Sequence, residues 1–166
     1  MLNRVNSKSS ADCDSAFDHY NRFLFESSPL SLWIEDLSEI KIIVDGLIMS
    51  GIKDCTDYMW RHPLELASLA DKVRTLDVNE AAIAMFASGD REIFLTRHNQ
   101  LIVDDVYLIS IIGFMTRAGN ETCFRKGAVV STSTGKPIKV LLRWNLVKDD
   151  TVAWSRVLVS ASPAIE

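Results

Sequence analysis

Apolar positions in the first quarter of the chain follow the period of a helix and then that of a strand. Within residues 12–26, Tyr20 and Leu24 lie one helical turn apart and predict an amphipathic helix. The proline of the following SSP run ends this helix, because proline cannot extend it. Residues 30–37 alternate in the manner of a short strand, with Trp33 on the face opposite to its apolar neighbours.

The stretch 38–73 predicts several helices in a row. Ser38 is a suitable N-cap for the first of them, whose apolar residues recur at intervals of three and four. These residues are Ile40, Ile43, Val44, Leu47 and Ile48. A short strand over 74–78 comes next. The capping-box spacing that starts at Asp77 predicts that this residue caps a helix over 80–87.

The remainder of the chain changes from helices to strands. One helical turn over 92–95 and a longer helix over 101–116 come first. Three strand patterns follow, over 122–132, 138–147 and 154–162, and the middle one has a clear period of two. The short turns between them predict an antiparallel meander. The order of elements predicts an α+β fold, with about five antiparallel strands, helices on one face and a preceding helix.

The composition is that of one ordinary globular domain. The chain has 166 residues, of which 48% are hydrophobic and 24% charged. We assign residues 12–166 to a single domain behind a polar, disordered tail at 1–11. The formal net charge of -4 disfavours nucleic-acid binding. Three scattered cysteines and the lack of a long apolar run argue against disulfides, a zinc site and membrane insertion. These features indicate a cytoplasmic protein.

Three phrases of the sequence, taken in order, resemble PAS domains of bacterial sensor histidine kinases and related signalling proteins. FLFESSPLSLWIED at 23–36 looks like the first helix and first strand of such domains. LDVNEAAIAMFAS at 76–88 looks like the end of their second strand and the helix after it. The segment 121–162 is similar to their last three strands. Two features depart from the family pattern: the helical insertion at 38–73, and the absence of an Asp-Ile-Thr phrase after Ser162.

The resemblance implies a signal-input domain and not an enzyme. Such a domain senses a small molecule or mediates dimerisation, and passes the signal to a downstream output module of a larger protein, such as a histidine kinase or a diguanylate cyclase. The apolar face of the helix over 12–26 has no evident cover, so we expect it to form a homodimer contact. Two alternatives stay open: a ligandless PAS domain that acts only as a dimerisation scaffold, and a small α+β-cone enzyme with a polar pocket and a paired Asp and His.

Six residues are candidates for contacts with a ligand, and each also has a purely structural interpretation. They are Trp33, Asn79, Phe86, Phe114, Arg143 and Trp144. The four aromatic residues would line a cavity between sheet and helices, or simply pack in the core. Asn79 would contact a ligand at the mouth of the cavity. Arg143 would pair with a ligand carboxylate if its face of the strand is the inner one, and is solvent-exposed if that face is the outer one.

Cofactor and catalytic motifs are absent from the sequence. His98, in the phrase TRHNQ, is near the place where PAS haem proteins carry their axial histidine, but its neighbours do not resemble a haem-binding motif. We interpret it as an exposed loop residue. Cys55 and Cys123 do not occupy the place of the reactive cysteine in flavin-binding relatives. No nucleophile–base–acid set or phosphate loop is present. We therefore predict no cofactor, no metal and no catalytic residue.

Overall fold

A single antiparallel sheet forms the centre of the domain. The computed structural model describes residues 8–87, 89–117, 123–146 and 152–165. Within them the strands are β1 Ser31–Asp36, β2 Arg74–Val78, β3 Cys123–Ser131, β4 Pro137–Leu146 and β5 Val157–Pro163. The order across the sheet is β2-β1-β5-β4-β3, so the first two strands join the last three at the β1–β5 pair. All four neighbouring pairs are antiparallel.

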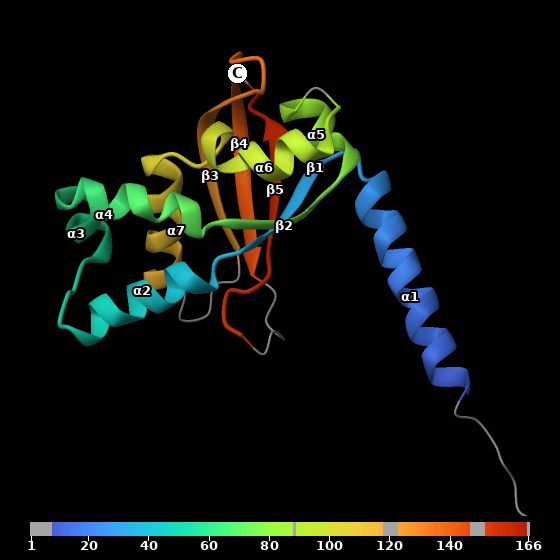
Figure 1. Cartoon of the computed structure of the whole chain (residues 1–166), viewed down its shortest axis with the longest axis horizontal. Coiled ribbons are helices and arrows are strands. Elements are labelled where there is room, and N and C mark those ends of the chain that lie inside the picture. The colour runs from blue at the N-terminus through green and yellow to red at the C-terminus, as the bar shows by residue number, and fades with distance from the viewer. Residues whose placement is uncertain (1–7, 88, 118–122, 147–151, 166) are drawn as a thin grey trace, which may run out of the picture.

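Most of the helices lie on one face of this sheet. The helices are α1 Lys8–Ser27, α2 Ser38–Met49, α3 Cys55–Arg61, α4 Pro63–Ser68, α5 Glu80–Phe86, α6 Arg91–Leu101 and α7 Asp105–Arg117, with a 3-10 turn at Ala70–Lys72. Helices α5, α6 and α7 cover the inner face of the sheet, and α2, α3 and α4 pack against α7. Helix α1 extends away from the body (Figure 1). The architecture is the predicted α+β fold with a preceding helix and a helical insertion.

The alternation of side chains in β4 identifies the inner face of the sheet. Val140, Leu142 and Trp144 are buried, whereas Lys139 and Arg143 are exposed. Because successive side chains of a strand point to opposite faces, the buried set faces the helices. Burying each large apolar side chain contributes about 1.5–3 kcal/mol, which fixes the register of this strand. The period-two pattern predicted for this strand is confirmed.

The connection between α5 and α7 differs from the prediction. The sequence predicts one helical turn over 92–95, but the structure has the 11-residue helix α6 there. Asp90 caps α6 by accepting a hydrogen bond from the Ile93 amide at 3.1 Å. Asp104 accepts a similar bond at the start of α7, so the long helix predicted over 101–116 begins later, at Asp105. These two aspartates divide the segment into two helices.

Two other predicted helix starts are also wrong in detail. Helix α1 begins at Lys8, so residues 8–11 are helical and do not belong to a disordered tail. Residues 1–7 lie outside the described residues. Ser38 is not the cap of α2; instead Asp36 Oδ1 accepts hydrogen bonds from the Ser38 amide at 2.9 Å and from its hydroxyl at 2.6 Å. Asp36, the last residue of β1, thus binds the first residue of the insertion.

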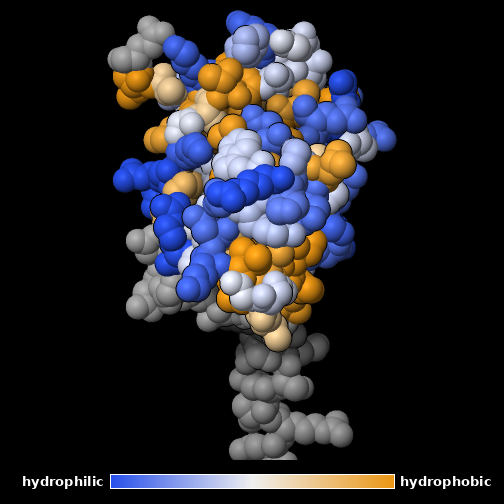
Figure 2. Space-filling model, turned by 90° about the vertical axis from the view of Figure 1, so that its left-hand side faces the viewer, coloured by the Kyte–Doolittle hydropathy of each residue, from blue (hydrophilic) through white to orange (hydrophobic). Residues whose placement is uncertain are grey.

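The helices α2, α3 and α4, with the 3-10 turn, form the insertion that the sequence predicts between β1 and β2. Several large apolar side chains of this insertion are exposed, namely Ile42, Ile48, Met49, Trp60 and Leu64. Figure 2 views the molecule from this side and shows apolar atoms next to strongly polar ones. None of the helices within the described residues is long and apolar enough to cross a membrane.

Candidate functional site

A carboxylate on the first strand lies at the centre of a buried polar cluster. Glu35 follows Trp33 by two residues in β1, so both side chains point to the inner face. Oε1 of Glu35 accepts hydrogen bonds from Trp33 Nε1 at 2.8 Å and from the Tyr107 hydroxyl at 2.5 Å. The same oxygen lies 2.8 Å from Nε2 of His98. Together with Trp144, we call these residues the Glu35 cluster.

The Glu35 cluster joins four elements of the fold. His98 comes from α6, Tyr107 from α7 and Trp144 from β4, whose Nε1 donates a hydrogen bond to the Tyr107 hydroxyl at 3.2 Å. All five side chains are at most 3% exposed. Burial, followed by the negative charge of Glu35, raises the pKa of Tyr107 well above its ordinary value. The phenol is therefore neutral, and its hydroxyl donates a hydrogen bond to the Glu35 carboxylate.

Two atoms of the Glu35 cluster are buried without a hydrogen-bond partner in the part of the chain that the structure describes. They are Oε2 of Glu35 and Nδ1 of His98. An unsatisfied buried polar atom costs about 1–3 kcal/mol, and folded proteins contain few of them. Local departures from full pairing of this kind are characteristic of functional sites. The cluster is therefore the first candidate for a functional centre.

A cavity of about 280 Å³ adjoins the Glu35 cluster, between α7 and the strands β3 and β4. Tyr107 and Trp144 belong both to its wall and to the cluster. The rest of the wall is mainly apolar, and its polar members are Asp104, Ser110 and Lys126. Ligand pockets commonly have volumes of roughly 300–1,000 Å³, so this cavity lies at the lower limit of that range and suits only a compact molecule.

The four aromatic candidates from the sequence occupy different places. Trp144 lines the cavity, and Trp33 lies in the Glu35 cluster beside it. Phe86 packs against Trp33 with ring centroids 5.8 Å apart, and Phe114 packs against Trp154 at 5.0 Å. Both phenylalanines are fully buried in the core. The structure thus brings Trp33 and Trp144 to one site and gives Phe86 and Phe114 a packing role.

The two polar candidates do not present a polar group to the cavity. Arg143 is exposed on the outer face of β4, and its Nε donates a hydrogen bond to Sγ of Cys123 at 2.9 Å. Asn79 is fully buried, and its amide nitrogen donates to the backbone oxygens of Phe25 at 3.0 Å and Leu30 at 2.8 Å. Its oxygen accepts from two backbone amides, one of them in the first turn of α5. Asn79 is therefore the N-cap of α5, and its amide is fully used.

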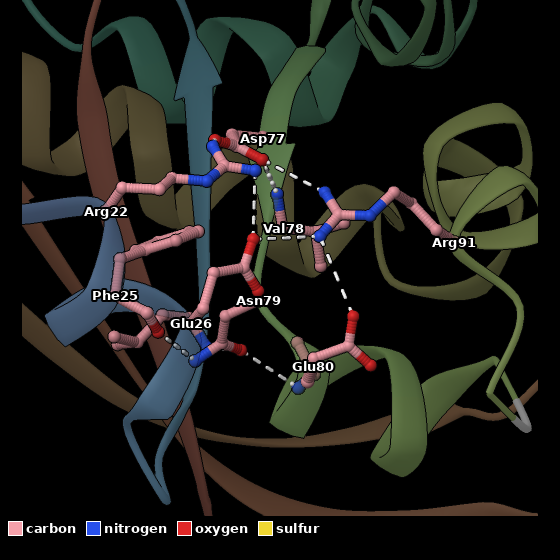
Figure 3. Close-up of polar contacts among 10 residues, drawn as sticks. Arg22, Phe25, Glu26, Asp77, Val78, Asn79, Glu80 and Arg91 are labelled. Atoms are coloured by element: carbon pink, nitrogen blue, oxygen red, sulfur yellow. Dashed lines mark hydrogen bonds and ion pairs between the residues drawn. The ribbon is translucent and has the colours of Figure 1, made fainter. Parts of the chain in front are cut away.

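Figure 3 shows the polar contacts that attach α1 to the body of the domain beside Asn79. Asp77, which the sequence predicts as the cap of α5, instead forms ion pairs with Arg22 of α1 and with Arg91 of α6, the latter at 3.1 Å. Arg91 also pairs with Glu26 of α1 at 3.0 Å. We call these four residues the α1 ion-pair network. Single exposed pairs contribute about 0–1 kcal/mol, but this network ties α1 to both β2 and α6.

Sequence reasoning does not select Glu35, His98 or Tyr107 as site residues. Its interpretation of His98 as an exposed loop residue is wrong, because His98 lies on α6 and is 1% exposed. One signal was present in the sequence: Glu35 shares the parity of Trp33, and an acidic residue on the inner face of a strand needs buried partners. Those partners are 63 and 72 residues away along the chain.

The pair of Glu35 and His98 resembles the paired Asp and His of the cone-type enzyme alternative, with glutamate in place of aspartate. Both side chains are sealed from solvent, with exposed fractions of 0% and 1%, so a dissolved substrate does not reach them. Among the described residues, no group of three His, Cys, Asp or Glu side chains is arranged to hold a metal ion. The burial of both side chains favours a structural role for this pair.

Comparisons with known proteins identify the fold. No protein-family model matches the sequence, and no curated protein matches it. The PAS domain of an HTR-like protein from Haloarcula marismortui superposes with a TM-score of 0.57 at 12% identity, over 95% of this chain and 99% of that one. A domain of the sensory box sensor histidine kinase/response regulator from Geobacter sulfurreducens gives 0.52 at 19% identity, over 94% and 98%. The chain has the PAS fold.

The similarity of this fold to solved structures extends beyond kinase domains. An RNA-binding light-oxygen-voltage receptor superposes on 98% of this chain with a TM-score of 0.52 and 8% identity, over 36% of its own length. Identities this low establish the shared fold, while the function has to be argued from the site. In this chain the candidate site consists of the cavity and the Glu35 cluster, between the helices and the inner face of the sheet.

Proposed function

We propose that this PAS domain is a signal-input module of a larger signalling protein, such as a sensor histidine kinase or a diguanylate cyclase, and is not itself an enzyme. One observation carries the proposal: the cavity shares two wall residues, Tyr107 and Trp144, with the buried Glu35 cluster. A molecule that enters the cavity therefore touches a hydrogen-bonded core. The similarity to a domain of a sensor histidine kinase/response regulator supports the same class of function.

A ligand in the cavity acts on the sheet through Tyr107. The hydroxyl of Tyr107 lies 2.5 Å from Glu35 Oε1, so a shift of this ring changes a hydrogen bond to β1. Strand β1 pairs with both β2 and β5. Strand β2 ends at the α1 ion-pair network, and β5 leads to the C-terminal end of the domain. A ligand that binds one packing of these elements better than another shifts the population toward it.

We propose a small ligand in place of flavin or haem. Trp33, Phe86 and Phe94 are fully buried and fill the space between β1 and the helices α5 and α6. Burial, aided by the charge of Asp54, raises the pKa of Cys55, so its thiol is poorly suited to form a reactive thiolate. These features favour a compact molecule that occupies the cavity beside α7.

A thermal-shift screen of small metabolites tests the sensing function. A ligand of the native state raises the melting temperature, by an amount that grows with its concentration relative to Kd. The variant Ala128→Phe places a phenyl ring in the cavity from β3 and abolishes the shift, while Leu141→Phe on the outer face of β4 preserves it. Equal shifts in both variants contradict binding in this cavity. A screen without any hit favours the ligandless dimerisation scaffold.

Helix α1 supports the dimerisation part of this proposal. Tyr20, Phe23 and Leu24 are 59%, 61% and 49% exposed, although they are large and apolar. Such a stripe is typical of a helix that packs against a partner. We propose that a second copy of the chain covers it and that the α1 ion-pair network holds the helix in a fixed direction for that contact.

Light scattering tests the dimer contact. The double variant Tyr20→Asp/Leu24→Asp places two charges on the stripe, and we expect it to be monomeric at concentrations where the wild type is dimeric. Leu64→Asp, at a site that is 87% exposed on α4, serves as the control for a new charge on an exposed apolar residue. A double variant with an unchanged dimer mass rules out the α1 contact.

A further inference from the structure

A second, polar depression adjoins the cavity beside α7. It has a volume of about 570 Å³ and lies between the start of α3, the C-terminal half of α7 and β3. Ser110 and Lys126 belong to the walls of both hollows. The apolar cavity and the polar depression are therefore neighbours that share these two residues, and the polar depression also includes a part of the helical insertion.

The polar depression has an excess of positive charge. Lys53, Arg117 and Lys126 line it, together with one carboxylate, that of Asp54. That carboxylate is engaged as the cap of α3, because it accepts hydrogen bonds from the Asp57 amide at 2.9 Å and from a neighbouring threonine hydroxyl. The depression thus has two more positive than negative groups, in a chain whose net charge is -4.

The three cations lack an ion-pair partner within the described residues. Other cations of the insertion are paired: Lys41 with Asp45, Arg61 with Asp57, and Lys72 with Glu39. Three unpaired positive groups that converge on one hollow repel each other, and an anion relieves that repulsion. Other cations of the described residues, such as Arg97, Arg125 and Lys139, are also unpaired, so what sets the depression apart is that three unpaired cations line one hollow.

One of the cations, Arg117, is held in place by two contacts, and Lys126 is half-buried. The guanidinium of Arg117 lies 5.2 Å from the ring centre of Phe124, and its Nε donates a hydrogen bond to the Gly113 oxygen at 3.0 Å. These contacts leave its terminal nitrogens for a ligand. Lys126 is half-buried on the inner face of β3, at the boundary with the apolar cavity. An arginine stacked in this way is preorganised for an oxyanion.

We infer that the ligand of this domain is a small amphipathic oxyanion. Its apolar body occupies the cavity between α7 and the strands β3 and β4, and its carboxylate or phosphate group binds Lys126 and Arg117, with Lys53 at the rim. The inference rests on the proposed function, because it names the chemical class of the molecule that the cavity receives. Charge-assisted hydrogen bonds to Lys and Arg account for the selection of a negatively charged head group.

Titration by NMR with matched probes tests this inference on the full chain. Octanoate is compared with 1-octanol, and phenyl phosphate with phenol, so the two arms distinguish a carboxylate from a phosphate. The readouts are the backbone amide signals of Ser110 and Lys126 and the side-chain Nε–Hε signal of Arg117. We expect at least one oxyanion to bind about five-fold or more tightly than its uncharged counterpart, with a difference that shrinks as salt is raised.

Two variants and a control make the result specific. Lys126→Gln and Arg117→Gln each reduce the preference for the oxyanion to less than half, whereas Lys136→Gln, in the exposed turn before β4, leaves it unchanged. Equal binding of charged and uncharged probes overturns the oxyanion inference and leaves the cavity of the proposed function in place. An oxyanion that binds without moving the Arg117 signal, or that binds both variants as tightly as the wild type, overturns the inference as well. So does the failure of all four probes to shift any signal of α7 or β3.

Discussion

Replacing Glu35 with leucine removes the acceptor at the centre of the Glu35 cluster. Oε1 of Glu35 takes hydrogen bonds from Trp33 and Tyr107 and lies beside Nε2 of His98, at 2.5–2.8 Å. Leucine leaves these groups in a site without solvent, where each unsatisfied donor costs about 1–3 kcal/mol. We expect Glu35→Leu to lower the free energy of unfolding by about 3–5 kcal/mol, as for other buried charged partners that are removed. A domain of this kind has about 5–15 kcal/mol in total.

Urea denaturation, followed by tryptophan fluorescence and far-UV circular dichroism, measures this loss. Glu35→Gln keeps one carbonyl oxygen as an acceptor, so we expect a smaller loss of about 1–2 kcal/mol. Glu92→Leu is the matched control, because Glu92 is exposed on α6 and its loss changes stability by about 0.5 kcal/mol or less. If Glu35→Leu and Glu92→Leu unfold at the same urea concentration, the hydrogen bonds assigned to Glu35 do not stabilise the folded protein.

Three further predictions concern charge and the attachment of α1. Burial acts to raise the pKa of Asp36, but hydrogen bonds from Ser38 and the charge of Arg74 outweigh burial and lower this pKa. Asp36 therefore contributes stability above about pH 4, and this contribution is lost as pH falls. The difference in unfolding free energy between wild type and Asp36→Asn should therefore narrow in urea titrations from about pH 5 to pH 3; a constant difference contradicts the lowered pKa. The pH dependence expected for Tyr107 is opposite to that of Asp36. Its raised pKa contributes stability that is lost as pH rises above about 10. The unfolding free energy of Tyr107→Phe should therefore fall less than that of the wild type between about pH 9 and pH 11. Arg91→Gln removes the ion pairs to Asp77 and Glu26. It should lower the free energy of unfolding by about 1 kcal/mol or less and make amide hydrogen exchange in residues 20–27 faster. Unchanged exchange in these residues means that the network does not hold α1.

The strands of the C-terminal half follow directly from the sequence. The alternation of Val140, Leu142 and Trp144 with polar residues decides both the secondary structure and the inner face, because only one register buries the apolar set. The insertion is equally evident from its apolar spacing. In these segments local pattern and tertiary burial favour the same structure, so prediction succeeds.

Helix α6 and the Glu35 cluster show where such reasoning fails. The buried face of α6 consists of Phe94, His98 and Leu101, and the histidine hides the helical period. The buried ring of His98 has its polar partner, Glu35, on β1, and that partner is 63 residues away along the chain. A polar residue whose burial depends on a distant polar partner leaves no periodic signal in its own segment. The same argument applies to Asp77. Its carboxylate does not cap α5 as predicted, but forms ion pairs with Arg22 and Arg91, which are distant in the sequence.

On the proposed function, a small molecule that binds beside α7 changes the packing at the ends of the domain. Hydrogen–deuterium exchange of the full chain, with and without the tightest-binding compound of the thermal-shift screen, tests it most directly. We predict slower exchange in α7, β3 and β4, together with a changed rate in residues 20–27 of α1, which the α1 ion-pair network connects to β2. Protection that is absent from α7 and β3, or that stays confined to them while α1 is unchanged, contradicts a signal-input function for this domain.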